Sequence, residues 1–285
     1  MTPSPPIPSA NLGLSRRLES AEGHACAMFC EARRHVKPQS GTEWLSVDGV
    51  YTVFSGVESP VTQTFGLGIL HEASDGLTPA VLDTIEDFFF SRGTAAVHEV
   101  SPFAGVAALD LLCESQYRPV EISSVLYQPA TPREFPVRTG VTARVAKEVE
   151  IAAWVDVLAR GWLHEYPEQR EFISENGAVS AACQGSVRFL AELNGEPGAA
   201  GTLFVHDRVA LFGGAATVPA MRRHGLQTAL IEARIQYAAA HGCDLLMLVA
   251  EAGSESQRNA ERNGFRVAYT RTKWRKSCPG NSSAK

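Results

Sequence analysis

One stretch of the chain, residues 209–230, constrains the fold more than any other: VALFGGAATVPAMRRHGLQTAL. It begins as an apolar strand, passes through a loop with a proline, two arginines, a histidine and a glycine, and enters an Ala/Leu-rich helix. Such a junction directs several backbone N–H groups and a helix N-terminus toward one point. Because first-turn amides lack partners within the helix and the helix dipole is positive there, the stretch predicts an anion site suited to a phosphate.

The loop supplies further groups for an anion. Gly225 lets the backbone approach a bulky ligand, and the amides from about Arg223 to Thr228 are expected to point into one cavity. Arg222, Arg223 and His224 add positive charge, and the Thr228 hydroxyl can donate a hydrogen bond to a phosphate. A helix start with solvated basic residues is the alternative that so short a motif leaves open.

The length of the chain and its prolines indicate two domains. At about 100–200 residues per domain, a chain of 285 residues allows one large domain or two smaller ones. Three prolines within residues 129–136 discourage helix and sheet. We therefore expect a linker at residues 129–137 between domains at residues 12–128 and 138–274.

Apolar periodicity and turn residues predict alternating strands and helices in both halves. The dipeptides Asp48-Gly49 and Asn194-Gly195 are typical of tight turns, and a helix at residues 15–36 is expected to be interrupted or weakened near Gly23. A flexible tail is expected at residues 1–11 and a disordered one at residues 275–285. Further helices are expected at residues 78–91, 103–115, 148–161, 168–182, 226–241 and 254–263. Strands are expected at residues 43–47, 50–55, 62–70, 95–100, 121–127, 142–145, 187–193, 201–206, 245–249 and 265–273, besides the one that opens the 209–230 stretch.

Composition argues against several classes of function. The net charge is −5, so neither nucleic acid nor an anionic membrane surface is an expected partner. No apolar run approaches the roughly 18 residues that a membrane-spanning helix needs. Six cysteines lack CxxC spacing and no secretory signal precedes them, which predicts free thiols, a cytoplasmic location and no metal site.

The loop resembles the acyl-coenzyme A (CoA) loop of the GCN5-related N-acetyltransferase (GNAT) superfamily, whose signature is Gln or Arg, two residues, Gly, one residue, then Gly or Ala. Arg222 and Gly225 fit this signature, and Gln227 departs from its last position. Downstream, an apolar strand and the dipeptide Gly264-Phe265 follow as in the family, so the resemblance covers residues 141–274. It implies an α/β fold in which each domain has a mixed, mostly antiparallel sheet flanked by helices.

The resemblance also implies an enzyme and its donor. The expected reaction is acetyl transfer from acetyl-CoA, or another acyl-CoA, to a primary amine of a small molecule or peptide by direct attack in a ternary complex. In this family the loop-bearing strand and the next one splay apart and hold the pantetheine arm, for which the small residues 213–216 leave room. Backbone N–H groups of residues 215–218 are the implied donors to the thioester carbonyl and the oxyanion. The expected cofactor-binding residues are Ala215, Ala216, Thr217, Val218, Arg222, Arg223, His224, Gly225, Leu226, Gln227, Thr228, Ser256 and Asn259.

The sequence gives a weaker signal for the catalytic residues than for the CoA loop. Ala260 stands where many family members carry a tyrosine that protonates the leaving thiolate, and Gly253 replaces a frequent asparagine. Candidates to replace the tyrosine, each of which could equally be structural, are Ser256, Asn259 and Tyr269. Glu251, just past the central strand, is the candidate base, with a purely structural role as the alternative. Expected substrate-binding residues are Trp162, Glu165 and Tyr166, for which a structural aromatic cluster is the competing interpretation.

The first half resembles a degenerate copy of the same domain. Residues 62–70 and the helix from Thr78 take the places of the loop-bearing strand and its helix, but the signature is missing between them. Glu72 and Asp75 put negative charge there, so no CoA is expected to bind this half. A monomer or homodimer is expected. The alternatives are a catalytically silent acyl-CoA-binding or regulatory protein and, without a Gly-x-Gly-x-x-Gly after a strand to support it, an unrelated dinucleotide binder.

Overall fold

The computed structural model describes residues 9–57, 59–72 and 76–279. They form two compact units, and each unit is made of segments that are not consecutive in the sequence. Unit 1 holds residues 126–249 and 255–266. Unit 2 holds the described residues within 9–125, 250–254 and 267–279. These units differ from the expected domains at residues 12–128 and 138–274, because residues 250–254 and 267–274 belong to unit 2.

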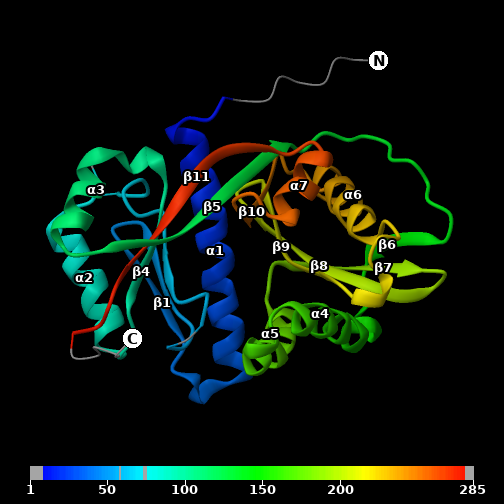
Figure 1. Cartoon of the computed structure of the whole chain (residues 1–285), viewed down its shortest axis with the longest axis horizontal. Coiled ribbons are helices and arrows are strands. Elements are labelled where there is room, and N and C mark those ends of the chain that lie inside the picture. The colour runs from blue at the N-terminus through cyan, green and yellow to red at the C-terminus, as the bar shows by residue number, and fades with distance from the viewer. Residues whose placement is uncertain (1–8, 58, 73–75, 280–285) are drawn as a thin grey trace. The chain divides into compact units, whose positions relative to one another are not determined.

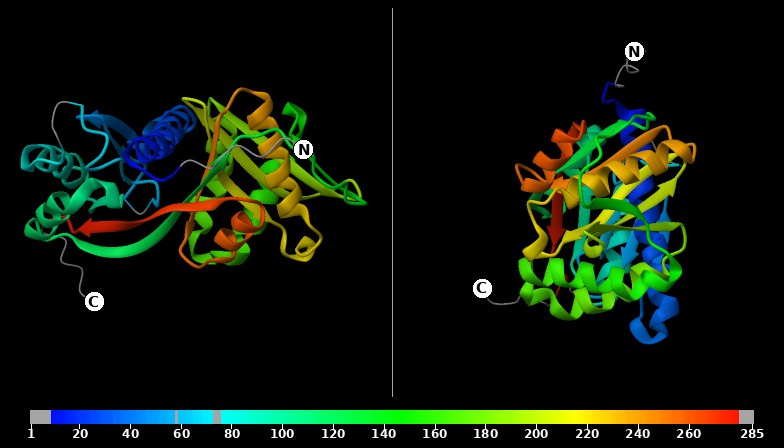
Figure 2. Two further views of the ribbon diagram at one scale, coloured as in Figure 1. Left: turned by 90° about the horizontal axis from the view of Figure 1, so that it is seen from above. Right: turned by 90° about the vertical axis from the view of Figure 1, so that its right-hand side faces the viewer.

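Unit 1 is a sheet covered by helices on both faces. The order of its strands is β5 (Arg118–Pro129), β10 (Leu245–Glu251), β9 (Val209–Thr217), β8 (Glu196–His206), β7 (Ser186–Leu193) and β6 (Val141–Val145). Pairing is antiparallel from β6 to β9 and parallel between β9 and β10. Its helices are α4 (Ile151–Glu165), α5 (Arg170–Ala182), α6 (Leu226–Ala240) and α7 (Glu255–Arg262). Figures 1 and 2 show α4 and α5 on one face of β7–β9 and α6 on the other.

The core of unit 1 explains why α4 lies where it does. Trp154 is fully buried, and its indole N–H donates to the carbonyl of Gly201 on β8 at 3.3 Å. Val157 and Leu158 pack with it against Leu190 of β7. Burying such side chains contributes about 1.5–3 kcal/mol each, so α4 is held against the sheet by its apolar stripe.

Unit 2 is likewise built on hydrogen-bonded strands. The order of its strands is β1 (Glu43–Val47), β2 (Val50–Phe54), β3 (Gln63–Phe65), β4 (Ala96–Val100), β11 (Arg266–Lys276) and β5. β3 and β4 pair parallel, while β1–β2, β2–β3 and β4–β11 pair antiparallel. Its helices are α1 (Leu12–Val36), α2 (Pro79–Phe90) and α3 (Gly105–Glu114). The expected α/β class, with mixed and mostly antiparallel sheets flanked by helices, is confirmed.

Local turn chemistry was predicted correctly. Asp48 and Gly49 have φ of 52° and 86° in the β1–β2 hairpin, and Asn194 and Gly195 have φ of 51° and 84° between β7 and β8. Both are left-handed pairs, which match the twist of the flanking strands. Gly242, with φ of 79°, follows α6. Among the described residues, no helix has both the length and the apolar character needed to cross a bilayer.

Three expectations about single elements were wrong. Helix α1 is not interrupted at Gly23, because a Cβ there would lie 2.4 Å from Cδ2 of Tyr51, so the glycine permits close packing of the helix. The strand expected at residues 62–70 ends at Phe65, since Gly66 turns the chain with φ of 81°. β5 continues to Pro129, so the expected linker begins inside a strand.

The expected tails are shorter than the sequence indicated. Asn11 caps α1, and its side-chain oxygen accepts the Leu14 N–H at 2.9 Å. At the other end, β11 reaches Lys276, so the disorder expected from Arg275 onward was wrong for the first two of these residues. Residues 1–8 and 280–285 lie outside the described residues, as does Asp75.

Candidate functional site

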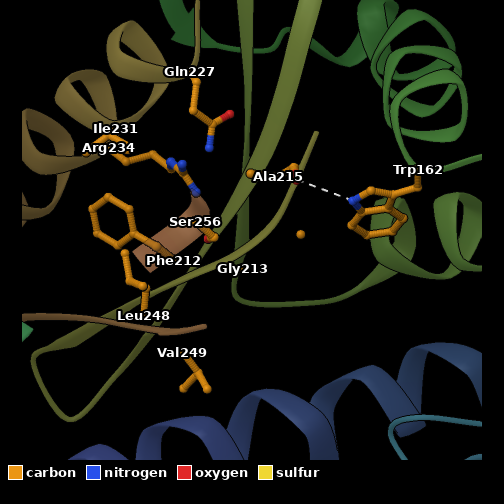
Figure 3. A pocket seen from close by; sticks show the side chains of 11 residues that line it. Trp162, Phe212, Gly213, Ala215, Gln227, Ile231, Arg234, Leu248, Val249 and Ser256 are labelled. Carbon is orange, nitrogen blue, oxygen red and sulfur yellow. Dashed lines mark hydrogen bonds between the residues drawn. The ribbon is translucent and has the colours of Figure 1, made fainter. Parts of the chain in front are cut away.

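The parallel strands β9 and β10 separate partway along their length. Among the described residues they pair only from Val209 to Leu211 against Leu245 to Met247, although both strands continue, to Thr217 and Glu251. A pocket of about 260 Å³ opens beside the separated segments (Figure 3). It is lined by Trp162, Phe212, Gly213, Gly214, Ala215, Gln227, Ile231, Arg234, Leu248, Val249 and Ser256.

A β-bulge lies on the pocket side of β9. Ala200 of β8 pairs with Ala216, and Thr202 pairs with Gly213, so β9 carries one extra residue between these pairs. Gly214 there has φ of 50°, and a Cβ would lie 2.8 Å from the Thr202 hydroxyl oxygen. The Trp162 indole N–H donates to the Ala215 carbonyl at 3.3 Å. The bulge thus turns part of the β9 backbone away from the ladder and toward the pocket.

The loop after β9 leads into a helix start that no side chain caps. A short 3-10 turn over Pro219–Met221 precedes Arg223, which has a left-handed φ of 67°, and Gly225, with φ of 83°. Gly225 stands at the N-cap of α6 and offers no side-chain acceptor, and Ala229 is the first residue of α6 whose N–H bonds back, to the Gly225 carbonyl at 3.0 Å. Among the described residues, the amides of residues 226–228 therefore have no capping partner. Such amides are available donors of the kind that an anion accepts from, and the phosphate site itself stays a prediction.

The charged side chains around this loop are only partly available. The Arg222 guanidinium donates to the Glu165 carboxylate at 2.9 Å and to the Thr217 carbonyl at 3.4 Å. Glu165, expected to contact substrate, thus ties the end of α4 to the loop. Such an exposed pair contributes about 0–1 kcal/mol, so a stronger anion can displace it. Arg223 and His224 are exposed and add positive charge nearby.

Gln227, the departure from the family signature, reaches the pocket. The Thr217 hydroxyl donates to its side-chain oxygen at 3.3 Å, which links the start of α6 to the end of β9. Thr228 is half-buried on the first turn of α6, and Leu226 is buried. The structure therefore brings together the loop and the pocket through a side chain that the signature lacks.

Of the four backbone groups expected as donors, one lies at the pocket. The Val218 N–H donates to the Gly198 carbonyl at 2.9 Å and is not available to a ligand. Ala216 and Thr217 are paired in register with Ala200 and Ala199 of β8. Ala215, at the bulge, lines the pocket.

The expected catalytic and substrate residues are scattered. Ser256 and Trp162 line the pocket, whereas Asn259 and the exposed Tyr166 are not among its lining residues. Glu251 is exposed at the end of β10, among the residues of unit 2. Tyr269 is buried in unit 2.

The surroundings of Tyr269 remove it from the list of candidate acids. Its hydroxyl donates to the Glu19 carboxylate at 2.9 Å, and its ring meets Phe103 edge to face. Burial, reinforced by the nearby Glu19 charge, raises the pKa of Tyr269 well above its usual value. The hydroxyl is therefore committed to the core of unit 2.

Sequence reasoning missed Arg234, whose side chain lies in the pocket beside Phe212. A signal was present, because this arginine interrupts the apolar side of α6 between the buried residues Ile231 and Ile235. A charged residue at such a position must find buried partners, which singles it out for inspection.

Comparisons with known proteins agree with this geometry. A family model described as the acetyltransferase (GNAT) family matches residues 151–265. A search of curated proteins found no match. Among solved structures, a GCN5-related N-acetyltransferase from Kribbella flavida is 18% identical, with a TM-score of 0.63 over 94% of this chain and 96% of that one.

Two further structures share the fold. A tandem GNAT protein from the clavulanic acid biosynthesis pathway is 12% identical, with a TM-score of 0.58 over 97% of this chain and 98% of that one. A GCN5-related N-acetyltransferase from Sphaerobacter thermophilus is 18% identical, with a TM-score of 0.53 over 82% of this chain and 75% of that one. Residues 151–265, which contain the whole pocket, therefore belong to the GNAT acetyltransferase family, in a chain with the tandem GNAT fold.

Proposed function

We propose that the protein is an acyl-CoA-dependent N-acyltransferase that moves an acetyl group from acetyl-CoA to a primary amine of a small molecule or peptide. One observation carries the proposal: a short loop joins β9, the strand that separates from β10 beside the pocket, to the uncapped start of α6. An anion site and a narrow cleft in continuous sequence suit a ligand with a phosphate group and a long polar arm.

The residues present fit such a donor. The pyrophosphate would lie against the amides of residues 223–228, with Arg222 and Arg223 as charged neighbours. The pantetheine arm would follow residues 213–215, where small side chains leave the β9 backbone accessible. A volume of about 260 Å³ is below the ~300–1,000 Å³ of pockets that enclose a drug-sized ligand. We therefore expect the pocket to take the arm and leave the nucleotide in solvent.

Acetyl-CoA supplies an acyl group activated as a thioester. The Ala215 N–H at the bulge is the proposed donor to the thioester carbonyl, and the Trp162 hydrogen bond to the Ala215 carbonyl would hold that peptide in place. The attacking amine must be neutral, which requires a group that accepts its proton. Glu251, an exposed carboxylate at the end of β10, is the proposed base, directly or through water.

Calorimetry with CoA and acetyl-CoA tests the donor, and thiol release over a panel of amines tests the reaction. The panel should include amino acids, polyamines, aminoglycosides, peptide N-termini and lysine-containing peptides. We expect binding of both ligands and thiol release with at least one amine class. Failure to bind CoA would remove the proposal.

A catalytically silent acyl-CoA-binding protein is the second candidate. It is favoured by Ala260, which is buried on α7. Many family members carry at this position the tyrosine that protonates the leaving thiolate. The same panel separates the two functions, since binding without turnover of any amine supports the silent protein.

A further inference from the structure

Arg234 places a buried cation in the pocket. It is 2% exposed, and Figure 3 shows its guanidinium group pointing from α6 into the pocket. Its Nε–H donates to the Leu230 carbonyl at 3.1 Å, and one Nη1–H donates to the Thr202 carbonyl at 3.2 Å. The guanidinium carbon lies 4.7 Å from the centre of the Phe212 ring. These contacts fix the group beside the bulge on β9.

No carboxylate balances this charge among the described residues. Burial lowers the pKa of Arg234 to about 9, and no neighbouring charge offsets that effect. The other fully buried arginine, Arg271 of unit 2, is also 2% exposed but forms ion pairs with Glu19, Glu22 and Glu99. Arg234 therefore remains charged at neutral pH, held by two carbonyls and the Phe212 ring.

The Arg234 guanidinium group has N–H donors that remain for a ligand. A guanidinium group carries five N–H donors, and two of them make the bonds to Leu230 and Thr202. A buried charge without a counter-charge costs free energy in the empty protein. Fixed charges of this kind occur where negative charge develops during a reaction, because a site oriented in advance needs no reorganisation at that moment.

The position of Arg234 identifies which part of the donor it would meet. Its guanidinium group bonds to the Leu230 carbonyl, four residues or about 6 Å beyond Leu226 at 1.5 Å per residue, so it lies further along the helix than a pyrophosphate at the helix start. The pantetheine arm carries no charge. Negative charge arises at the inner end of the arm, on the sulfur that leaves during acyl transfer.

Given the proposed function, we propose that Arg234 stabilises the departing CoA thiolate, in place of the tyrosine that Ala260 replaces. The amine nitrogen forms a bond to the thioester carbon, the carbon–sulfur bond then breaks, and its electron pair goes to sulfur. Unused N–H groups of Arg234 donate to that sulfur, while the proton of the amine goes to the base or to water. The guanidinium keeps all its protons, and the thiolate is protonated by solvent after release.

The pKa of the CoA thiol bound to the protein tests this assignment without an acceptor amine. Ultraviolet absorbance of the thiolate is followed as pH rises, and the same titration with CoA lacking its sulfur is subtracted to remove the protein's cysteines. A cation within about 4–6 Å lowers the pKa of a neighbouring acid by about 1–3. We therefore expect the bound thiol to be at least tenfold more acidic in the wild type than in Arg234→Met, with Arg234→Lys in between.

Arg188→Met is the matched control, because Arg188 is a partly buried arginine of the same unit that donates to the Ala181 carbonyl and does not line the pocket. It should leave the thiol pKa unchanged. If Arg234→Met fails to fold, the wild type is compared with Arg234→Lys and with free CoA. A thiol no more acidic on the wild type than in solution overturns the proposal.

The remaining outcomes separate this inference from the proposed function. If the wild type does not bind CoA in calorimetry, the proposed function fails. If CoA binds equally to both proteins and the thiol pKa does not differ, only the role of Arg234 fails. If Arg234→Met weakens the binding of succinyl-CoA at least tenfold more than that of acetyl-CoA while the pKa of the CoA thiol stays the same, Arg234 recognises a carboxylate on the acyl group. That outcome also overturns the proposal.

Discussion

Two helix starts distinguish the halves of this chain. Helix α2 in unit 2 begins after Thr78, whose hydroxyl accepts the Val81 N–H at 3.3 Å, and Pro79 at its first position has no N–H to satisfy. Helix α6 in unit 1 begins after Gly225, which has no side chain to cap it. The Val81 amide of α2 has a side-chain acceptor, whereas the first amides of α6 have none among the described residues. The proposed anion site therefore depends on what the start of α6 lacks.

The strands before these helices differ in the same sense. After β3 the chain turns at Gly66 and buries Leu67 and Ile69 in unit 2. After the paired part of β9, unit 1 instead presents Gly213 and Gly214 to a pocket. In unit 2, side chains fill the space after β3, whereas in unit 1 the space beside the separated part of β9 stays open as a pocket.

The buried arginines complete the comparison. Arg271 has three carboxylate partners and belongs to a closed network, whereas Arg234 has none among the described residues. In unit 2 the buried charge holds β11 against α1, whereas in unit 1 the proposed role of Arg234 assigns the buried charge to the departing thiolate.

The largest expected effect is on stability, in unit 2. Arg271→Met leaves Glu19, Glu22 and Glu99 without their shared cation, and breaking a buried pair from one side costs about 3–5 kcal/mol. Urea unfolding monitored by circular dichroism measures this loss. Arg258→Met, which breaks an exposed pair with Glu255, should cost less than about 1 kcal/mol. Equal losses in the two variants would mean that the network does not hold β11.

The next effect is on ligand affinity, in unit 1. Gly225→Asp puts a side chain at φ of 83° and a negative charge beside the uncapped amides of α6. We expect the Kd for CoA to rise about 100-fold, which corresponds to about 2.7 kcal/mol. The control is Gly242→Asp, because Gly242 has φ of 79° at the other end of the same helix, with nothing within 4 Å of a Cβ. Retained affinity in Gly225→Asp, measured by calorimetry, would refute the loop as the pyrophosphate site.

A pH effect should arise from the closed network. Burial raises the pKa of Glu19 from 4.5 to about 7, partly offset by Arg271, so the folded protein binds a proton that the unfolded chain releases at lower pH. This contribution to stability is fully present below about pH 4.5 and is lost as the pH rises to about 7.

Glu19→Gln tests that assignment, because it removes the titrating group and keeps the shape. The free energy of unfolding should fall less steeply between pH 4.5 and 7 in this variant than in the wild type. Glu31→Gln, on the same helix but paired with the exposed Arg34, is the control and should keep the wild-type slope. Parallel slopes in all three proteins would assign the titration to another group.

The smallest effect concerns the cap of α2. Thr78→Ala should destabilise the protein by about 1 kcal/mol, because the Val81 N–H loses its acceptor. Thr84→Ala is the control, since the Thr84 hydroxyl only bonds back to the Ala80 carbonyl on the exposed side of the same helix. Thermal unfolding measures both. Calorimetry with CoA should show no second binding site in Thr78→Ala. A second site would mean that an uncapped helix start is sufficient to bind CoA, and the comparison between α2 and α6 would then be wrong.

Several features of the fold were predictable because they depend on neighbouring residues. Asp48-Gly49 and Asn194-Gly195 form turns since these residues adopt positive φ at little cost. Gly225 marks the start of α6 for the same reason, and the spacing of Arg222 and Gly225 indicated the family. The expected strand and helix around the loop were therefore correct.

Long-range features were not predictable in this way. The sequence places Tyr269 a few residues after Gly264-Phe265, but β11 pairs with β4, and the hydroxyl meets Glu19, 250 residues away in the chain. Val218 follows the bulge, yet its N–H is taken by Gly198. No local pattern specifies which distant strand or carboxylate will be the partner.

The sequence by itself therefore determined the class of fold and the position of the loop, with Gly225 at the start of its helix, because backbone conformation and helix starts are properties of adjacent residues. Only the tertiary structure decided that Tyr269 is committed to the core of unit 2 and that Arg234 stands in the pocket with no counter-charge among the described residues. The physical reason is that the availability of a hydroxyl or a charge depends on the groups that surround it in space, and those groups come from distant parts of the chain.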